Sequence, residues 1–184
     1  MWAIFESLCY MVKETDFDIP ISGLKIGTHQ FVYEIDGSFF ELFDYTELKD
    51  SALTVSIELT KKVNLLTLEY HVHGQVTLSC DTCSDDYLQP IEECFNQIVK
   101  ITDWQEEETN DEIIYLSSQE HTLSLSHSIY EFVCLSLPRR RAHSSVVECN
   151  QEMINTLNQY QTIHTKEDNN IIDPRWAKLT ELKN

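Results

Sequence analysis

The stretch LLTLEYHVHGQVTLSCDTC, residues 65–83, combines a strand pattern with a pair of cysteines. Apolar side chains occupy every second position of its first part, as in a strand that buries one face. These are Leu66, Leu68, Tyr70 and Val72 and, after an interruption at Gly74, Val76, Leu78 and Cys80. A glycine inside such a pattern indicates a break or a bulge. We therefore predict a strand over residues 65–80, with Cys83 in the turn that follows it.

A second alternating run lies just upstream and predicts a strand over residues 52–61. The positions expected to face the core are Leu53, Val55, Ile57 and Leu59. Shorter patterns, rich in β-branched and aromatic residues, predict further strands over residues 30–35, 91–101 and 112–116. We expect all of these strands to belong to one sheet.

Helical spacing appears in three other places. A short helix is predicted at three aromatic residues, Phe39, Phe40 and Phe43. A longer one is predicted from the apolar stripe Leu125, Ile129, Phe132 and Val133, with Ser124 or Ser126 as its cap and Pro138 as its stop. A third is predicted from Cys149 to Tyr160, with the stripe Met153, Ile154 and Leu157.

These elements predict an α+β fold, in which two or three helices pack on a mainly antiparallel sheet that is either open or curled toward a partial barrel. At 184 residues the chain is long enough for one domain with a real core. We assign residues 13–160 to that domain and residues 1–12 to a leader. Residues 161–184 are expected to form a polar link and a short helix that opens at Asp173-Pro174.

The charge balance is strongly acidic, with 13 basic and 31 acidic residues and a net charge of -18. This much negative charge repels phosphate at long range, so nucleic-acid binding by bulk charge is disfavoured. Residues 103–112 hold six acidic residues and no basic one, which is typical of a solvated loop or of a contact for a basic partner.

The compartment expected from the sequence is a reducing cytoplasm. Six cysteines at spread positions do not resemble the disulfide framework of a small secreted protein. No apolar run reaches the 18 or so residues of a membrane helix. The first twelve residues contain Glu6 and no basic segment before it, so we do not expect a signal peptide.

Cys80 and Cys83, with His143 and Cys149 downstream, form a candidate Cys3His set of the kind that zinc favours. Two other interpretations stay open: a redox dithiol, and free thiols without a role. A redox dithiol of the thioredoxin type needs a lowered thiol pKa at a helix N-terminus. Here the pair follows a strand, and the acidic residues of Ser84-Asp-Asp86 are expected to raise the pKa of a nearby thiol.

Two further sets of side chains leave two interpretations each. His71 and His73 share one face of their predicted strand, where they are either metal ligands or ordinary solvent-facing residues. Arg139, Arg140 and Arg141 lie just before His143. Their guanidinium groups either bind phosphate or pair with acidic loops of the same chain.

The sequence motifs of common enzymes are missing. The chain has no P-loop, no GxGxxG, no GxSxG and no HExxH, and its four glycines are too few for a phosphate-cradling loop. An enzymatic role therefore depends on Cys80 and Cys83 as a redox pair, and we expect a protein that is not an enzyme.

Several segments in a fixed order resemble the YceD-type family, which is named for the accumulation of large-subunit ribosomal RNA. The segments are Ile19-Pro-Ile-Ser-Gly-Leu-Lys25, Cys80-Asp-Thr-Cys83, Tyr130-Glu-Phe-Val-Cys-Leu-Ser-Leu-Pro138, His143, Cys149-Asn150 and Asp173-Pro-Arg-Trp176. The resemblance extends from about Ile19 to Leu182. Many members have a second proline before the histidine, where this chain has Arg141.

The resemblance implies a cytosolic factor of bacteria and plastids that is needed for normal levels of large-subunit ribosomal RNA. It implies metal binding and nucleic-acid binding, and no catalytic activity. The family's cysteine pair corresponds to Cys80 and Cys83, its histidine to His143 and its later cysteine to Cys149.

Two functional hypotheses follow, and a third is weaker. In the first, the chain is a non-enzymatic factor for ribosomal RNA accumulation or ribosome assembly, stabilised by zinc, and Arg139, Arg140 and Arg141 contact phosphate. In the second, it is an acidic adaptor that binds a basic ribosomal or assembly protein without metal. The third, a thiol oxidoreductase, requires a lowered pKa at Cys80 or Cys83. None of the three involves a membrane.

Overall fold

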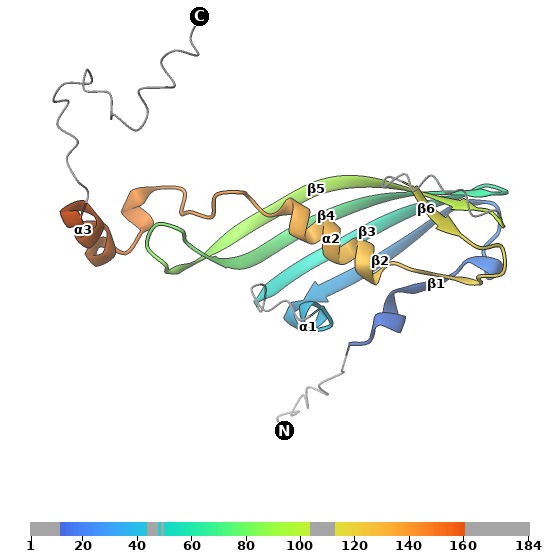
Figure 1. The fold of residues 1–184 in the computed structure, drawn as a ribbon, viewed down its shortest axis with the longest axis horizontal. Helices are drawn as coiled ribbons and strands as arrows, with labels where there is room; N and C mark the ends of the chain where they lie inside the picture. Colours follow the sequence, from blue (N-terminus) through green and yellow to red (C-terminus); the bar gives the residue numbers. More distant parts are fainter. Residues whose placement is uncertain (1–11, 44–47, 49, 104–112, 161–184) are drawn as a thin grey trace, which may run out of the picture.

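The computed structural model describes residues 12–43, 48, 50–103 and 113–160, and it shows an α+β fold (Figure 1). The strands are β1 (Asp18–Pro20), β2 (Gly27–Asp36), β3 (Ser51–Lys61), β4 (Leu65–Ser79), β5 (Asp86–Ile101), β6 (Ile113–Leu116) and β7 (Thr122–Ser124). The α-helices are α1 (Gly37–Glu41), α2 (Ser126–Ser136) and α3 (Gln151–Tyr160). Three 3-10 turns, η1 (Glu14–Phe17), η2 (Ile21–Gly23) and η3 (Val146–Glu148), complete the order.

The five main strands form one open sheet in the order β2-β3-β4-β5-β6. All neighbours pair antiparallel except β5 and β6, which are parallel. In the described residues β2 and β6 are separate edges, so the sheet does not close into a barrel. The predicted mainly antiparallel α+β fold is therefore confirmed.

The β4–β5 hairpin is longer than the rest of the sheet, and this length positions the candidate site. Its strands pair from Leu65 opposite Lys100 to Ser79 opposite Asp86. The neighbouring strand β3 stops at Ser51, which lies opposite Val76. The last rows of the hairpin therefore extend past the sheet, and the turn between the strands lies at its far end.

Gly74 is required by a close approach of two strands and not by a bulge, because the pairing of β3 with β4 continues through it without a break. Its φ is +141°, in the region that favours glycine, and a Cβ there would run into the backbone carbonyl of Ala52.

One face of the sheet forms the core, and α2 lies across it (Figure 1). The Phe132 ring of α2 stacks on Phe95 with a centroid separation of 4.7 Å. Beneath the helix, the Tyr70 hydroxyl donates to Gln97 Oε1 at 2.7 Å, and Gln97 Nε2 donates to Ser128 Oγ at 2.9 Å. These contacts anchor α2 on β4 and β5, so the chain leaves the helix directed toward the hairpin tip.

Several predicted boundaries need correction. The cap of α2 is Leu125 and neither serine, since no side chain accepts a hydrogen bond there. Helix α3 begins at Gln151, after Asn150, whose Oδ1 accepts from the N–H groups of Glu152 and Met153. Strand β5 begins at Asp86, five positions earlier than predicted, and the β1–β7 pair was not predicted.

Three predictions lie largely or wholly outside the described residues: the leader 1–12, the acidic stretch 103–112, and the link and helix of 161–184. No helix in the described part of the chain is both long and apolar enough to cross a membrane.

Candidate metal centre

The hairpin tip is a tight knuckle that turns two thiols inward. The Cys80 N–H donates to the carbonyl of Asp85 at 2.9 Å, and the Ser84 N–H donates back to the Cys80 carbonyl at 2.8 Å. Ser84 closes the turn with a φ of 62°, in the left-handed region. Cys80 and Cys83 are only 2% and 1% exposed as a result.

The segment after α2 docks on this tip through paired hydrogen bonds. The Asp81 N–H donates to the Arg141 carbonyl at 2.6 Å, and the Arg141 N–H donates to Asp81 Oδ2 at 2.9 Å. The His143 ring then lies against Tyr87, with their centroids 5.2 Å apart. Asp81, between the two cysteines, therefore holds the chain that carries the third and fourth candidate ligands.

Local structure also fixes Cys149. It follows η3 directly and precedes α3, whose N-terminus is capped by Asn150. Gln151 Nε2 donates to the carbonyls of Val146, Val147 and Cys149, which ties the turn to the helix. Cys149 is only 6% exposed.

The four predicted ligands come together. Their donor atoms, three Sγ and one imidazole nitrogen, all lie within 4.8 Å of one another in Cys80, Cys83, His143 and Cys149. His143 Nδ1 lies 3.7 Å from Cys83 Sγ and 3.6 Å from Cys149 Sγ. A tetrahedral zinc ion with ordinary bond lengths separates sulfur and nitrogen ligands by about 3.5 Å. The set therefore fits a metal such as zinc.

The three cysteines form a small cluster of their own, separate from the main core. Tyr87, Ala142 and Ile154 of α3 pack against it. Of the stripe predicted for α3, Met153 and Leu157 stay exposed, and only Ile154 turns inward. Figure 1 shows α3 at the end of the long hairpin. The tip is thus a second, small unit at a distance from the centre of the sheet.

The Cys80 thiol has a lowered pKa, contrary to the expectation from the neighbouring acidic residues. Burial raises this pKa, but N–H donors of Cys83, His143 and Thr82 and the His143 side chain outweigh it and bring the pKa to about 5. For Cys149, burial and then the side chains of Cys83 and Cys80 raise the pKa to about 11. One thiol is thus prepared as a thiolate, the form that binds metal.

A lowered thiol pKa also serves redox catalysis, but accessibility separates the two roles. Reactive cysteines lie in partly exposed surroundings, whereas Cys80 and Cys83 are almost completely buried. Four protein donors leave no open position, which is typical of structural zinc sites and not of catalytic ones.

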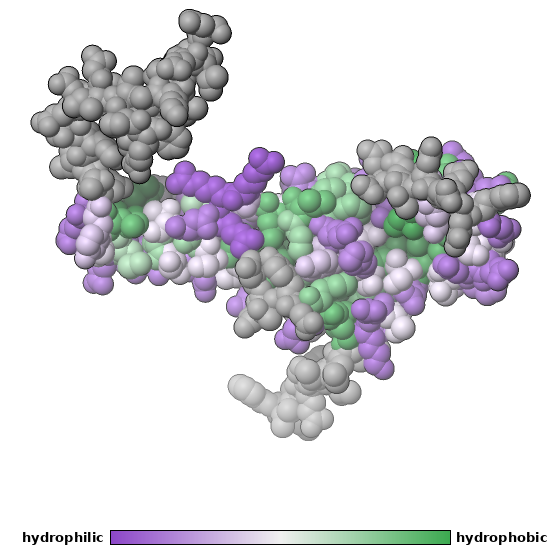
Figure 2. Space-filling model, in the orientation of Figure 1, coloured by the Kyte–Doolittle hydropathy of each residue, from purple (hydrophilic) through white to green (hydrophobic). Residues whose placement is uncertain are grey.

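The three arginines lie on the segment that connects α2 to this cluster. Arg139 and Arg140 are exposed, and Arg141 is half-buried with its backbone held by Asp81. Figure 2 shows strongly hydrophilic residues along this segment.

Comparison with known families gives one match. The family model "Large ribosomal RNA subunit accumulation protein YceD" matches residues 68–183, and the chain therefore belongs to this family. All four clustered residues lie inside the matched range. Neither a curated protein nor a solved structure matches the chain.

Sequence reasoning did not identify the two residues that assemble the centre, Asp81 and Asn150. Asp81 had a visible signal, because a carboxylate between two candidate ligands is well placed to accept from the backbone of an approaching segment. Asn150 directly before a helical pattern is a standard capping signal.

Proposed function

We propose that this chain is a non-enzymatic cytoplasmic factor that supports large-subunit ribosomal RNA accumulation or ribosome assembly, with a hairpin tip held by zinc. The family description supports the ribosomal role. The observation that carries the zinc is the convergence of Cys80, Cys83, His143 and Cys149 in one buried cluster. In this proposal zinc links two distant chain segments, and the protein residues supply every ligand.

The zinc would also position a basic segment. Arg139 and Arg140 immediately precede Arg141, whose N–H and carbonyl are both bonded to Asp81 of the knuckle. Docking fixes the backbone at this end of the segment, so less chain entropy is lost when the exposed guanidinium groups meet phosphate. A local contact of this kind works in a protein of net charge -18 because screening limits distant repulsion to about 10 Å at 0.1 M salt.

A second candidate function, an acidic adaptor for a basic ribosomal or assembly protein, is favoured by the face of the sheet opposite the core. Glu58 of β3, Glu69 of β4 and Glu92 of β5 all project from this face. A basic protein would pair with them, whereas RNA would be repelled.

RNA binding separates the two functions. The substitutions Arg139→Ala, Arg140→Ala and Arg141→Ala together should weaken binding to a ribosomal RNA fragment and lower the salt slope by roughly 0.7–0.9 for each phosphate that the arginines neutralise. A cleaner variant is Arg139→Ala with Arg140→Ala, which spares the docked residue. Its matched control is Lys25→Ala with Lys62→Ala, which removes the same charge from exposed positions elsewhere.

Equal RNA binding by the triple variant and the unsubstituted chain would reject the phosphate contact. If both double variants weaken binding to the same extent, only the overall charge matters and the arginines have no special role. Binding of a basic ribosomal protein that Glu58→Gln with Glu69→Gln abolishes would instead support the adaptor.

A further inference from the structure

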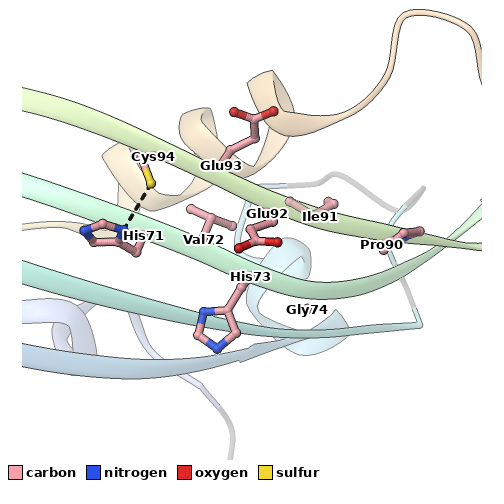
Figure 3. Close-up of a pocket in the computed structure, with 9 residues that line it drawn as sticks. All are labelled: His71, Val72, His73, Gly74, Pro90, Ile91, Glu92, Glu93 and Cys94. Atoms are coloured by element: carbon pink, nitrogen blue, oxygen red, sulfur yellow. Dashed lines mark hydrogen bonds between the residues drawn. The ribbon is translucent and has the colours of Figure 1, made fainter.

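The face of the sheet opposite the core holds a second set of metal-binding side chains, away from the hairpin tip. His71 and His73 of β4 both project from this face. In the antiparallel register, His71 lies opposite Cys94 of β5, and His73 lies opposite Glu92. The four exposed side chains thus occupy two adjacent rows on two neighbouring strands, and they line one hollow next to Gly74 (Figure 3).

Two of the four donors are already in contact. Cys94 Sγ lies 3.1 Å from His71 Nδ1, and Figure 3 shows the two side chains directed toward each other. His73 and Glu92 follow in the next row, while Glu93 points away from this group (Figure 3). After the thiol loses its proton, a thiophilic ion can bind between the sulfur and the imidazole nitrogen.

The geometry points to a second, exchangeable site for a borderline divalent cation such as zinc, with His71, His73 and Cys94 as ligands and Glu92 as a fourth. Alternate residues of a strand stand about 6.8 Å apart, and cross-strand partners have Cβ atoms about 5 Å apart. Side chains at these spacings can converge on one ion, since metal–nitrogen and metal–sulfur bonds are about 2.0 and 2.3 Å. Two imidazoles, a thiolate and a carboxylate form a donor set that suits zinc, cobalt or nickel better than calcium or magnesium.

The charge around this set also favours a cation. Glu58 and Glu69 lie directly opposite each other on the same face, in the row next to His71. Like charges in opposed positions repel, and a nearby divalent ion relieves that repulsion.

The set is open, unlike the buried centre. Among the described residues, three or more donor atoms lie within 4.8 Å of one another at the hairpin tip and not on the sheet face. On the sheet face, His73 and Glu92 must rotate toward the Cys94–His71 pair when an ion binds. Exposed side chains change rotamer readily, but ordering them costs affinity, so this site exchanges its ion while the tip retains its own.

Titration of the full-length, zinc-containing protein with Co2+ tests this site. A thiolate-to-cobalt charge-transfer band should grow with one added equivalent, without loss of the resident zinc. Cys94→Ser should abolish that band. His71→Gln and His73→Gln should each raise the Co2+ dissociation constant at least about tenfold, the smallest effect typical of groups that merely orient a metal ligand. Cys134→Ser and His121→Gln are the matched controls and should leave binding unchanged.

A second measurement protects against misreading an altered fold. The rate at which Cys94 is alkylated can be measured by peptide mapping. Co2+ should slow this alkylation in the unsubstituted chain and should not slow it in His73→Gln. The proposal is wrong if the band survives in Cys94→Ser, or if His73→Gln binds Co2+ as tightly as the unsubstituted chain. The alkylation result is distinguishable from the zinc proposal, because Co2+ bound at the sheet face should shield Cys94 in Cys149→Ser as well as in the unsubstituted chain.

Discussion

Loss of the metal should release the segment that docks on the hairpin tip and leave the sheet intact. Chelation, or the substitution Cys149→Ser, removes the link between the knuckle and the chain after α2. The Asp81 N–H reports this event directly, because it donates to the carbonyl of Arg141 at 2.6 Å. Its protection from hydrogen exchange therefore requires the segment to be docked.

The size of the effect follows from the length of chain that the centre closes. Cys83 and His143 are 60 positions apart. By the chain-entropy estimate used for disulfides, closing such a loop is worth about 4 kcal/mol. A ligand present at about a thousand times its dissociation constant stabilises by a similar amount, about 4.1 kcal/mol. The exchange rate of the Asp81 N–H should therefore rise about a thousandfold when the metal is removed.

Hydrogen exchange resolved by residue measures this prediction, with controls inside the same molecule. The Thr77 N–H donates to the carbonyl of Asp50 at 3.0 Å near the same end of β4, and that bond does not involve the segment after α2. It should keep its protection. Cys134→Ser removes a thiol outside the cluster. In this variant the Asp81 N–H should be as well protected from exchange as in the unsubstituted chain.

Unchanged exchange at Asp81 after complete chelation would refute the metal link. A second result would refute the separation of the tip from the sheet: equal loss of protection at Asp81 and at the buried strand residues Val55 and Tyr70.

Three further predictions concern the fold. Burial raises the pKa of Tyr70 well above its ordinary value of 10.0, so the neutral hydroxyl stabilises the folded state fully below pH 10, and this contribution is lost as the pH rises further. Between pH 10 and 11 the free energy of unfolding should fall less steeply with pH in Tyr70→Phe, by about 1.4 kcal/mol per pH unit. Urea titrations that give the same dependence on pH for both proteins would contradict this. Gly74→Ala should destabilise by roughly 1–3 kcal/mol in chemical denaturation because its Cβ meets the adjacent strand, whereas Gly23→Ala, which has open space, should change stability little; equal effects would reject the close approach. Asn150→Ala removes the cap of α3 and should destabilise this helix by about 1 kcal/mol, as measured by hydrogen exchange of the helix amides. The control Asn155→Ala, in the same helix, should cause a smaller loss.

The main strands were predictable because their signal is local. Alternation in β3 and β4 arises directly from the two-residue period of a strand with one buried face, as at Val55 and Tyr70. The first residues of β5 gave no such signal, since Asp86, Tyr87 and Leu88 lie on the part of the hairpin beyond the sheet and none of them is fully buried. The β1–β7 pair joins two three-residue strands far apart in sequence, and such short strands carry too few positions for a pattern.

The metal centre was predictable in part. The spacing of Cys80 and Cys83 is a local signal, but the approach of His143 depends on the anchoring of α2 and the length of the hairpin. The pKa of Cys80 was mispredicted because the sequence shows the charges of nearby carboxylates and not the direction of backbone N–H groups. The contact between His71 and Cys94 required the register of β4 and β5, which alternation alone does not determine.

The most direct test is the zinc content of the freshly purified, untagged protein, measured by elemental analysis together with a thiol titration before and after chelation. We predict one retained zinc per chain, with three of the six thiols shielded until the chelator is added. A metal-free protein in which all six thiols react at once would contradict the zinc centre, and the acidic adaptor would then be the better explanation.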